Sequence, residues 1–403
     1  MLRGAAQAAP FFCDFFMAEA IGPRKTRNTQ NIRTMNLFRI LLILSVSSVY
    51  SVGHPPVLLA RLAALGAADT TTEADIQQAI DKAISSGGGE VRIPAGTLVL
   101  EKGLRVENAR NLRIVGADRS GTILKLPPAT FAETAELTLA GSDKILLKRQ
   151  QRMASGMLLR IEAPGEIDSF TKEPKPYQAA KVKSIADGVL ILEQPLAFPV
   201  PAGTLIRDRK SPNVITIRGA SDGVHIDNLT LDGGRTANDP HISGHAQLCG
   251  VFAQGKYTYE SGPVEPVPSR IVVTRCTIRN CHGRGVAFYS VQDSEVSHCE
   301  ISDTTDEAVD LDHFSVRVSV HDNELRHSSE GMELNDANDC VVKNNRFIEC
   351  GVGINLWRFV KLPGWNEGNV IEGNLFERTK KAALQIQKGL TKNKVSGNTI
   401  VPP

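Results

Sequence analysis

The stretch VDLDHFSVRVSVHDNELRHSSEGMEL, residues 309–334, contains a pattern that recurs through the second half of the chain. A triplet of alternating apolar and polar residues opens it, Asn323 stands near its middle, and a second such triplet ends it. Alternation with a period of two predicts short strands that bury one face. Similar triplets stand at residues 251–253, 286–288, 309–311, 332–334, 354–356 and 384–386. We expect their outer positions to point into a core.

Asparagine indicates the period of this repeat. One position of each repeat holds asparagine or cysteine: Asn228, Cys276, Cys299, Asn323, Asn345, Asn374 and Asn398. Four of the six gaps measure 22–24 residues, and the gaps of 48 and 29 residues leave room for loops. A coil this short cannot bury its own apolar face, whereas stacked coils bury a continuous core. The repeat therefore predicts a β-solenoid in which asparagine satisfies backbone groups at one turn.

Composition narrows the class of protein. The 403 residues include 46 Lys+Arg and 44 Asp+Glu, which excludes a disordered chain and a polybasic nucleic-acid binder. Residues 1–55 are interpreted as an over-extended start followed by a secretory signal peptide, with Met35 as the candidate true start and residues 40–52 as the apolar core. We expect no membrane span after its removal, and a secreted, periplasmic or cell-surface location.

Two features together resemble the right-handed parallel β-helix proteins of the pectin-lyase-like (pectate lyase) superfamily. One is the asparagine ladder, and the other is ADIQQAIDKAISSGGGEVRIPAGTLVL, residues 74–100, followed by LRIVGADRSGTILKL, residues 112–126. The resemblance implies an all-β fold, a right-handed parallel β-helix built as a solenoid of 22–24-residue coils. It implies no single activity, because this fold hosts lyases, hydrolases, epimerases and adhesins.

The chain after the signal peptide divides into three parts. Residues 69–126 are expected to form an N-terminal cap and the first coils, residues 127–210 an inserted small β module, and residues 211–403 the parallel β-helix with an outward-facing cleft. The cap is a predicted amphipathic helix with Thr72 and Asp75 as its capping pair. Such a helix would cover the open apolar end of the solenoid.

The residues between the inward positions predict two outward ladders, because side chains alternate along a strand. The first ladder is Phe252, Ala287, Asp310, Glu333, Asn355 and Gln385, and the second is Gln254, Tyr289, Asp312, Asn335, Trp357 and Gln387. The strand ends are followed by His313, Asp336, Arg358 and Lys388. Acidic residues concentrate at the middle of both ladders.

This acidic cluster has an electrostatic cost. Asp310 and Glu333 would stand in coils about 4.8 Å apart, where two ionised carboxylates repel by about 3 kcal/mol. A bound cation, a salt bridge from Arg358, or a proton held on one carboxyl as a catalytic acid would relieve the repulsion. A merely solvated acidic face is the alternative, because solvent screens the charges.

Long insertions flank the same strand and would form the walls of a cleft. The candidate substrate-binding residues are Tyr289, Asn335, Asp336, Asn355, Trp357, Lys388, His245 and Trp365. Tyr257, Tyr259 and the two tryptophans are candidates for stacking on sugar rings, with packing inside the loops as the alternative.

Cation-assisted elimination fits these residue types best. Asp310, Asp312 and Glu333 supply oxygen ligands suited to Ca²⁺, which would neutralise a uronate carboxylate and acidify its α-proton. The catalytic candidates are Asp310, Asp312, Glu333, His313 and Arg358, with Lys388 and Tyr289 as further candidate bases. We therefore predict a secreted lyase that acts on an acidic, uronate-containing polysaccharide.

Two alternatives stay open. A glycoside hydrolase would use two of the three carboxylates as an acid and base pair, and a glycan-binding or surface-structural β-helix would use none. The polygalacturonase pattern is not matched, because His282-Gly-Arg284 stands where Asn-Thr-Asp is expected. The mannuronan epimerase pattern fails because His313 is displaced by one residue from its Asp-Pro-His. The six cysteines beyond residue 55 permit disulfides without requiring them.

Overall fold

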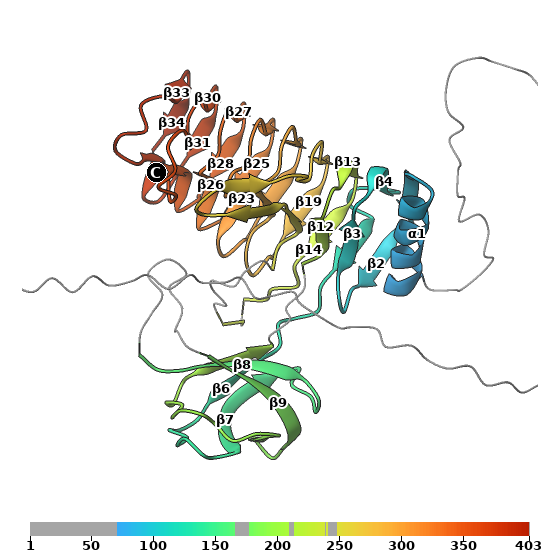
Figure 1. Cartoon of the computed structure of the whole chain (residues 1–403), viewed down its shortest axis with the longest axis vertical. Coiled ribbons are helices and arrows are strands. Elements are labelled where there is room, and N and C mark those ends of the chain that lie inside the picture. Colours follow the sequence, from blue (N-terminus) through green and yellow to red (C-terminus); the bar gives the residue numbers. More distant parts are fainter. Residues whose placement is uncertain (1–70, 166–176, 209–212, 238, 241–247, 403) are drawn as a thin grey trace, which may run out of the picture. The chain divides into compact units, whose positions relative to one another are not determined.

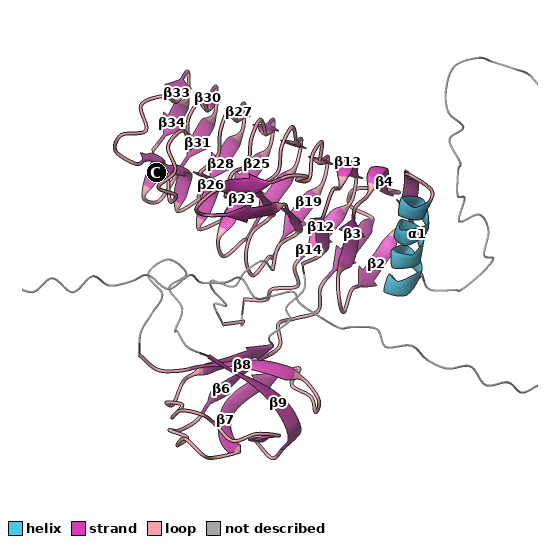
Figure 2. Ribbon diagram, viewed as in Figure 1, coloured by secondary structure: helices cyan, strands magenta, loops and turns pink. Residues whose placement is uncertain are grey.

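The computed structural model describes residues 71–165, 177–208, 213–237, 239–240 and 248–402. In this part of the chain the strands form three long parallel sheets along one axis, with one α-helix at the end of the stack (Figures 1 and 2). The predicted all-β fold, a parallel β-helix, is confirmed. The predicted signal peptide lies outside the described residues. Across the described ranges, no helix has both the length and the apolar character that a membrane crossing needs.

Each coil contributes one strand to each of three sheets, called A, B and C, except the last described coil, which contributes to A and B only. Sheet A pairs β1 (Gly89–Ile93), β4 (Arg110–Gly116), β13 (Asp222–Asp227), β18 (Val272–Thr274), β21 (Glu295–Ser297), β24 (Ser319–His321), β27 (Val341–Lys343), β30 (Val370–Glu372) and β33 (Lys394–Ser396). Sheet B pairs β2 (Gly96–Val99), β5 (Thr122–Lys125), β14 (Thr230–Asp232), β19 (Thr277–Arg279), β22 (Glu300–Ser302), β25 (Glu324–Arg326), β28 (Arg346–Ile348), β31 (Leu375–Glu377) and β34 (Thr399–Val401). Sheet C pairs β3 (Leu104–Glu107), β12 (Ile215–Arg218), β15 (Val251–Gln254), β20 (Val286–Tyr289), β23 (Glu307–Asp312), β26 (Glu330–Asn335), β29 (Val352–Trp357) and β32 (Ala382–Ile386).

Helix α1 (Glu73–Ser85) covers the first coil, as predicted. The Thr72 hydroxyl accepts a hydrogen bond from the Asp75 backbone N–H at 3.2 Å, and the Asp75 carboxylate accepts one from the Thr72 N–H at 2.8 Å. The helix buries Ile76 and Ile80 against the core of the β-helix. Gly88 lets the chain turn into β1, because a Cβ there would lie 2.5 Å from the Arg110 carbonyl oxygen.

The asparagine ladder follows sheet A and connects successive coils. The Asn345 amide donates to the Val320 carbonyl at 2.9 Å and to the Asn374 side chain at 3.0 Å, while its oxygen accepts from the Asn323 backbone N–H at 3.1 Å. The buried turn groups are thereby satisfied from coil to coil, as the sequence predicts. The six cysteines of the described chain are buried free thiols.

The residue before each ladder position takes the left-handed conformation and turns the chain from sheet A to sheet B. Its φ angle is 51° at Arg275, 54° at His298 and 55° at Asp322. Asn228 also has a positive φ, of 58°, and aligns with this position, so Leu229 aligns with the ladder. The prediction that Asn228 belongs to the ladder is therefore wrong by one residue. Asparagine occupies either position readily, because it tolerates left-handed φ angles.

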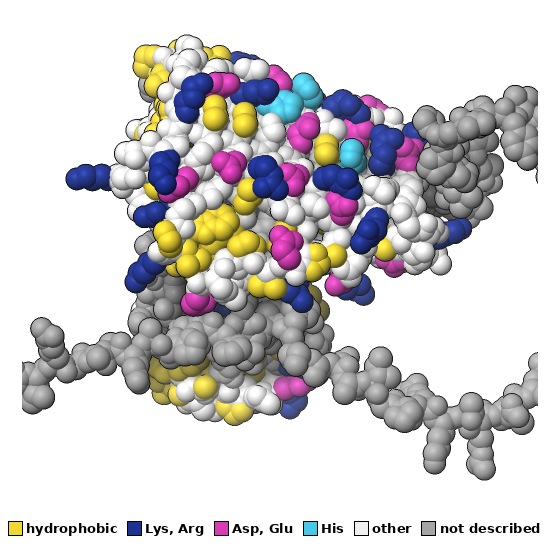
Figure 3. All heavy atoms as spheres, turned by 45° about the horizontal axis from the view of Figure 1, so that its top comes forward, with side chains coloured by type: hydrophobic (Ala, Val, Ile, Leu, Met, Phe, Trp, Pro, Cys, Tyr) yellow, Lys and Arg dark blue, Asp and Glu magenta, His cyan; other side chains and the backbone are white. Residues whose placement is uncertain are grey.

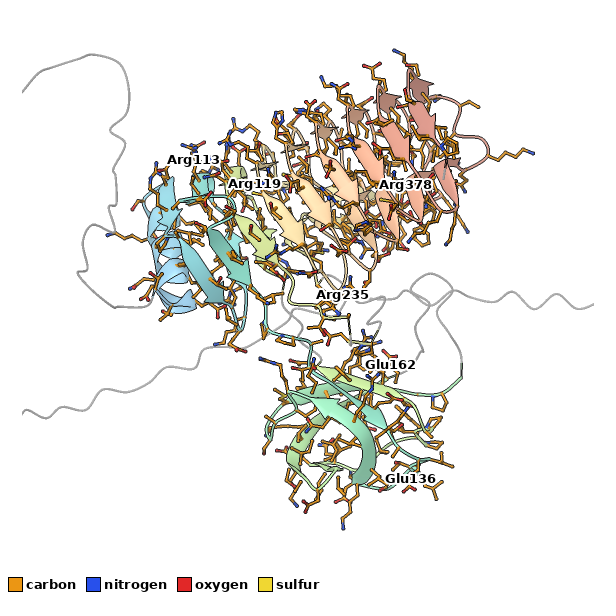
Figure 4. The ribbon with its side chains drawn as sticks, turned by 180° about the vertical axis from the view of Figure 1, so that it is seen from behind. Arg113, Arg119, Glu136, Glu162, Arg235 and Arg378 are labelled. Atoms are coloured by element: carbon orange, nitrogen blue, oxygen red, sulfur yellow. The ribbon has the colours of Figure 1, made fainter. Side chains whose placement is uncertain are left out.

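The inserted segment forms a closed antiparallel barrel with a core of its own. In spatial order its strands are β10 (Val189–Leu192), β7 (Lys144–Gln151), β6 (Phe131–Thr134), β11 (Leu205–Asp208), β8 (Leu158–Glu162) and β9 (Tyr177–Ala186). Closure leaves the sheet without a free edge. Figure 4 places Glu136 and Glu162 on the barrel, and Arg113, Arg119 and Arg378 on the β-helix.

Candidate functional site

The acidic residues of the two outward ladders stand in register on sheet C. Asp310 on β23 pairs with Glu333 on β26, which in turn pairs with Asn355 on β29. In the second ladder Tyr289 pairs with Asp312. The residues that alternate with them, such as Val309, Leu311, Met332 and Leu334, are fully buried in the coil interior. The register predicted from the period of two is confirmed.

These outward carboxylates do not face bulk solvent. Asp310 is 0% exposed, Asp312 2% and Glu333 8%, so the site is not a solvated acidic face and not an open cleft. The chain after β15 returns over this sheet as a hairpin of β16 (Lys256–Thr258) and β17 (Gly262–Val264). Tyr257 of this hairpin packs on the outward cluster of Phe252 and Tyr289. The β16–β17 hairpin therefore does not only stand beside the outward side chains of sheet C, because it also covers some of them.

Arg284 supplies the positive charge beside the cluster. Its Nε lies 2.6 Å from Asp310 and 2.7 Å from Glu307, and its Nη2 lies 3.2 Å from Asp306. Of the three predicted ways to relieve the repulsion, the salt bridge from Arg358 is not the one that the structure shows. Arg358 is exposed, and neither it nor Lys388 forms an ion pair with any described residue.

The carboxylates outnumber the cations around this point. One oxygen each from Asp310, Asp312 and Glu333 lies within 4.8 Å of the others, and Glu307, Glu330 and Glu333 form a second group of the same size. Burial raises the pKa of Asp310 to about 7, because the nearby Arg284 only partly offsets desolvation and Asp312 adds repulsion. Burial and the neighbouring Glu307 and Asp310 hold the pKa of Glu333 well above its usual range. A carboxyl proton is therefore available in this cluster near neutral pH.

His313 stands at the other end of the strand as a second cation. Its Nδ1 lies 2.9 Å from the Asp312 carboxylate and 3.9 Å from that of Asp336. Burial opposes a charge on the imidazole, but Asp312 and Asp336 outweigh it and raise the pKa of His313 to about 9. His313 is therefore protonated at neutral pH and serves Asp312 as a counter-ion rather than as a base. Both His313 and Phe314 have positive φ angles, 41° and 73°, which end the strand abruptly.

Aromatic side chains extend from His313 toward the surface. Tyr257 and Tyr259 each lie 5.1 Å from the His313 ring, and Tyr259 lies 5.3 Å from Phe359, which lies 6.2 Å from Trp357. Tyr259 is 42% exposed and Phe359 40%. We call Tyr257, Tyr259, Phe359 and Trp357 the aromatic strip. It offers flat apolar surface beside the carboxylates, as sugar rings require.

Several predicted binding residues have other contacts. Asn335 and Asp336 are fully buried, and their side chains accept hydrogen bonds from the Phe359 backbone N–H at 3.2 and 2.9 Å, so they position the loop. Trp365 packs on Phe314 at 4.6 Å. Lys388 is exposed beyond the strand, and His245 lies outside the described residues. Asn355 remains beside Glu333 and half-buried.

Sequence reasoning missed Arg284, Glu307 and Glu330 as members of the site. Continuing the register of Val286 and Val309 back by two residues would have placed Arg284 beside Glu307, which pairs with Glu330. The sequence pattern therefore contains the register of these residues, but they lie two positions before the triplets that define the repeat.

The family model described as "Right handed beta helix region" matches residues 213–400. These residues have the right-handed parallel β-helix fold. No curated protein matches the chain. Among solved structures, this β-helix protein is similar to an alginate lyase from Paenibacillus sp. str. FPU-7, at 10% identity over 82% of this chain and 94% of that chain, with a TM-score of 0.44.

Two further solved structures are similar to this chain. DFA-IIIase from Arthrobacter chlorophenolicus A6 is 10% identical over 81% of this chain and 64% of that chain, with a TM-score of 0.44. The enzymatically active domain of tailspike protein 2 from bacteriophage CBA120 is 10% identical over 84% of this chain, which spans 42% of that chain, with a TM-score of 0.42. At these identities the likeness concerns the fold alone.

Proposed function

We propose that this β-helix protein is a glycan-cleaving enzyme that hydrolyses a glycosidic bond with buried carboxylates of sheet C. The observation that carries the proposal is the meeting of Asp310, Asp312 and Glu333, whose oxygens lie within 4.8 Å of one another beneath an aromatic strip. Beside this cluster, the side chains of Arg284 and Asp306 are 16% and 39% exposed.

Asp310 and Asp312 have different surroundings, and we assign them different roles in the reaction. Asp310, with its raised pKa, donates a proton to the leaving glycosidic oxygen. Asp312 accepts a hydrogen bond from the His313 backbone N–H at 2.6 Å, and its carboxylate lies 2.9 Å from His313 Nδ1. Asp312 attacks the anomeric carbon as the bond to the leaving oxygen breaks. Asp310 then takes a proton from the water that releases the sugar.

The distance between the carboxylate oxygens favours this mechanism, in which Asp312 attacks first and water second, over direct attack by water. Inverting glycosidases keep their two carboxyl groups roughly 6.5–9.5 Å apart to leave room for a water. The oxygens here lie closer than that, within 4.8 Å. We therefore expect the anomeric configuration of the product to be retained.

The cation-assisted lyase is the second candidate, and one observation favours it. Neither oxygen of Asp310 accepts a well-aligned hydrogen bond from a described residue, and three hard oxygen donors converge there, which suits Ca²⁺. A Ca²⁺ ion held by Asp310, Asp312 and Glu333 would neutralise a uronate carboxylate. The candidate bases weaken this proposal, because His313 is protonated, burial raises the pKa of Tyr289, and Arg358 and Lys388 are exposed away from the carboxylates.

A screen of neutral and uronate-containing polysaccharides, each with Ca²⁺ or with a chelator, tests both candidates. We expect new reducing ends without unsaturated ends, insensitive to the chelator, and retention observed by NMR of the first product. Unsaturated ends that disappear with the chelator would support the lyase instead. Export, predicted from residues 1–55, would bring the protein to such glycans.

Matched variants make the screen specific to the site. Asp312→Asn, which removes the proposed nucleophile, should abolish cleavage, whereas Glu324→Gln, an equally conservative change on the surface of sheet B, should leave it intact. Binding of a glycan by the wild type without cleavage of any panel member would contradict an enzymatic function.

A further inference from the structure

We propose that His298, His321 and Asp322, on the outside of the β-helix, form a binding site for a first-row divalent transition metal such as Zn²⁺. One ligand atom from each of the three residues lies within 4.8 Å of the other two. The site lies on the turn between sheets A and B, and it shares no residue with the carboxylates of sheet C. The proposal is therefore independent of the proposed function.

The backbone brings the three residues together in two successive coils. His321 is the last residue of β24 and pairs with Ser297, the last residue of β21. His298 and Asp322 follow directly, both in the left-handed conformation, and the His298 backbone N–H donates to the His321 carbonyl at 3.3 Å. Neighbouring coils lie about 4.8 Å apart. These turns belong to a rigid, repeated ladder, so the ligand backbones are already fixed before a metal binds.

The side chains converge on one point. The His298 and His321 ring centroids lie 5.8 Å apart at an angle of 86°, and His321 Nδ1 lies 2.7 Å from an Asp322 carboxylate oxygen. His321 Nε2 also lies 3.4 Å from Glu295, which adds a carboxylate beside the site. His298 and Asp322 are exposed, so their side chains can move to the ligand separation of about 3.3 Å that a tetrahedral zinc site requires. Figure 3 shows histidine side chains exposed among charged side chains on one face of the β-helix.

The donor set determines which metal is expected. Two imidazoles and one carboxylate suit Zn²⁺, Co²⁺ or Ni²⁺, whereas Ca²⁺ prefers oxygen ligands alone. Three protein ligands leave a fourth position for water. A metal at this site would therefore differ in kind from a Ca²⁺ ion on Asp310, Asp312 and Glu333, and the two can be titrated separately.

The test uses the full chain without a polyhistidine tag, after treatment with a chelator. Calorimetric titration with Zn²⁺ should give one site per chain, and Co²⁺ should give the visible absorption of a site with nitrogen ligands. His298→Ala and His321→Ala should each weaken Zn²⁺ binding by more than about tenfold. His327→Ala is the matched control, because His327 is also exposed beside two acidic residues, Asp303 and Glu349.

Circular dichroism of the metal-free variants checks that each one folds. Binding lost in both site variants and kept in His327→Ala would support the proposal. Equal Zn²⁺ affinity in the wild type and in a His298→Ala/His321→Ala double variant would overturn it, and so would a wild type without measurable binding. Zn²⁺ binding that disappears only in Glu333→Gln would place the metal on sheet C and would likewise overturn it.

Discussion

One line of charged side chains across successive coils lies on sheet B and another on sheet C, and the two differ in their order of charge. On sheet B, Arg346 donates to Glu324 at 2.7 Å and to Glu377 at 2.8 Å, so opposite charges alternate near the surface. On sheet C, Asp310 and Glu333 stand side by side, and Arg284 lies at one edge. The Arg346 side chain is 49% exposed, whereas Asp310 is fully buried.

The difference separates exposed, alternating charges from like charges that are buried together. Exposed, alternating charges contribute little to stability, because solvent screens them. Like charges that share a buried site destabilise the fold unless one of them holds a proton or binds a cation. The sheet C line therefore fits the proposed proton transfer or ion binding, and the following changes test the contrast between the two lines.

The largest effect is expected from Asp310→Asn. Loss of the proton donor should lower kcat/KM on the substrate found in the screen by about 10²–10⁴-fold. The isosteric amide preserves volume and cannot ionise, so the melting temperature at neutral pH should not fall below that of the wild type. Glu324→Gln on sheet B serves as the control and should turn over normally. Unchanged turnover by Asp310→Asn would remove this residue from the proposed mechanism.

Stability should fall as the pH rises. The folded-state pKa of Asp310, about 7, lies above its ordinary value of 3.8, so its contribution is fully present below pH 3.8 and is lost as the pH rises toward 7. The loss amounts to about 4 kcal/mol. His313, with a pKa of about 9 against 6.5, acts in the same direction between those two values. Denaturant unfolding at pH 5, 7 and 9 measures the slope, which should flatten in Asp310→Asn, whereas an equal slope in both proteins would contradict the assignment.

Removal of the arginine on each line compares the two regions directly. Arg284→Gln leaves buried carboxylates without their cation and should lower the free energy of unfolding by about 3 kcal/mol. Arg346→Gln removes exposed ion pairs and should lower it by less than about 1 kcal/mol. Denaturant unfolding at pH 7 measures both. Equal losses would mean that the sheet C carboxylates are solvated like those on sheet B.

A further pair of changes tests the asparagine ladder, which connects the coils that carry both lines of charge. Asn345→Ala leaves the Val320 carbonyl and the Asn323 N–H without partners and should lower the free energy of unfolding by about 2 kcal/mol. Asn398→Ala, in the last described coil, should have a smaller effect because Asn398 is only half-buried. A larger loss from Asn398→Ala than from Asn345→Ala would show that the ladder is not the source of the effect.

Local patterns were sufficient for the parts of the molecule that repeat. The period of two placed Asp310 beside Glu333, the Thr72 and Asp75 pair capped α1, and the spacing of asparagines gave the coil length. Asn228 was assigned to the ladder with an error of one residue, because asparagine fits two adjacent turn positions equally well. The role of Arg284 was missed, because it lies outside the alternating triplets and its long side chain reaches forward to Asp310.

The sequence by itself determined the solenoid, its register and which side chains leave each coil, because these follow from repeats that neighbouring residues enforce. Only the tertiary structure decided how deeply those side chains are buried and which charges surround them. Tyr257 and Phe359, distant in sequence from Asp310, are brought toward the same face, and the cluster is buried there. A carboxylate's pKa depends on the dielectric and the charges around it, and segments far along the chain supply both.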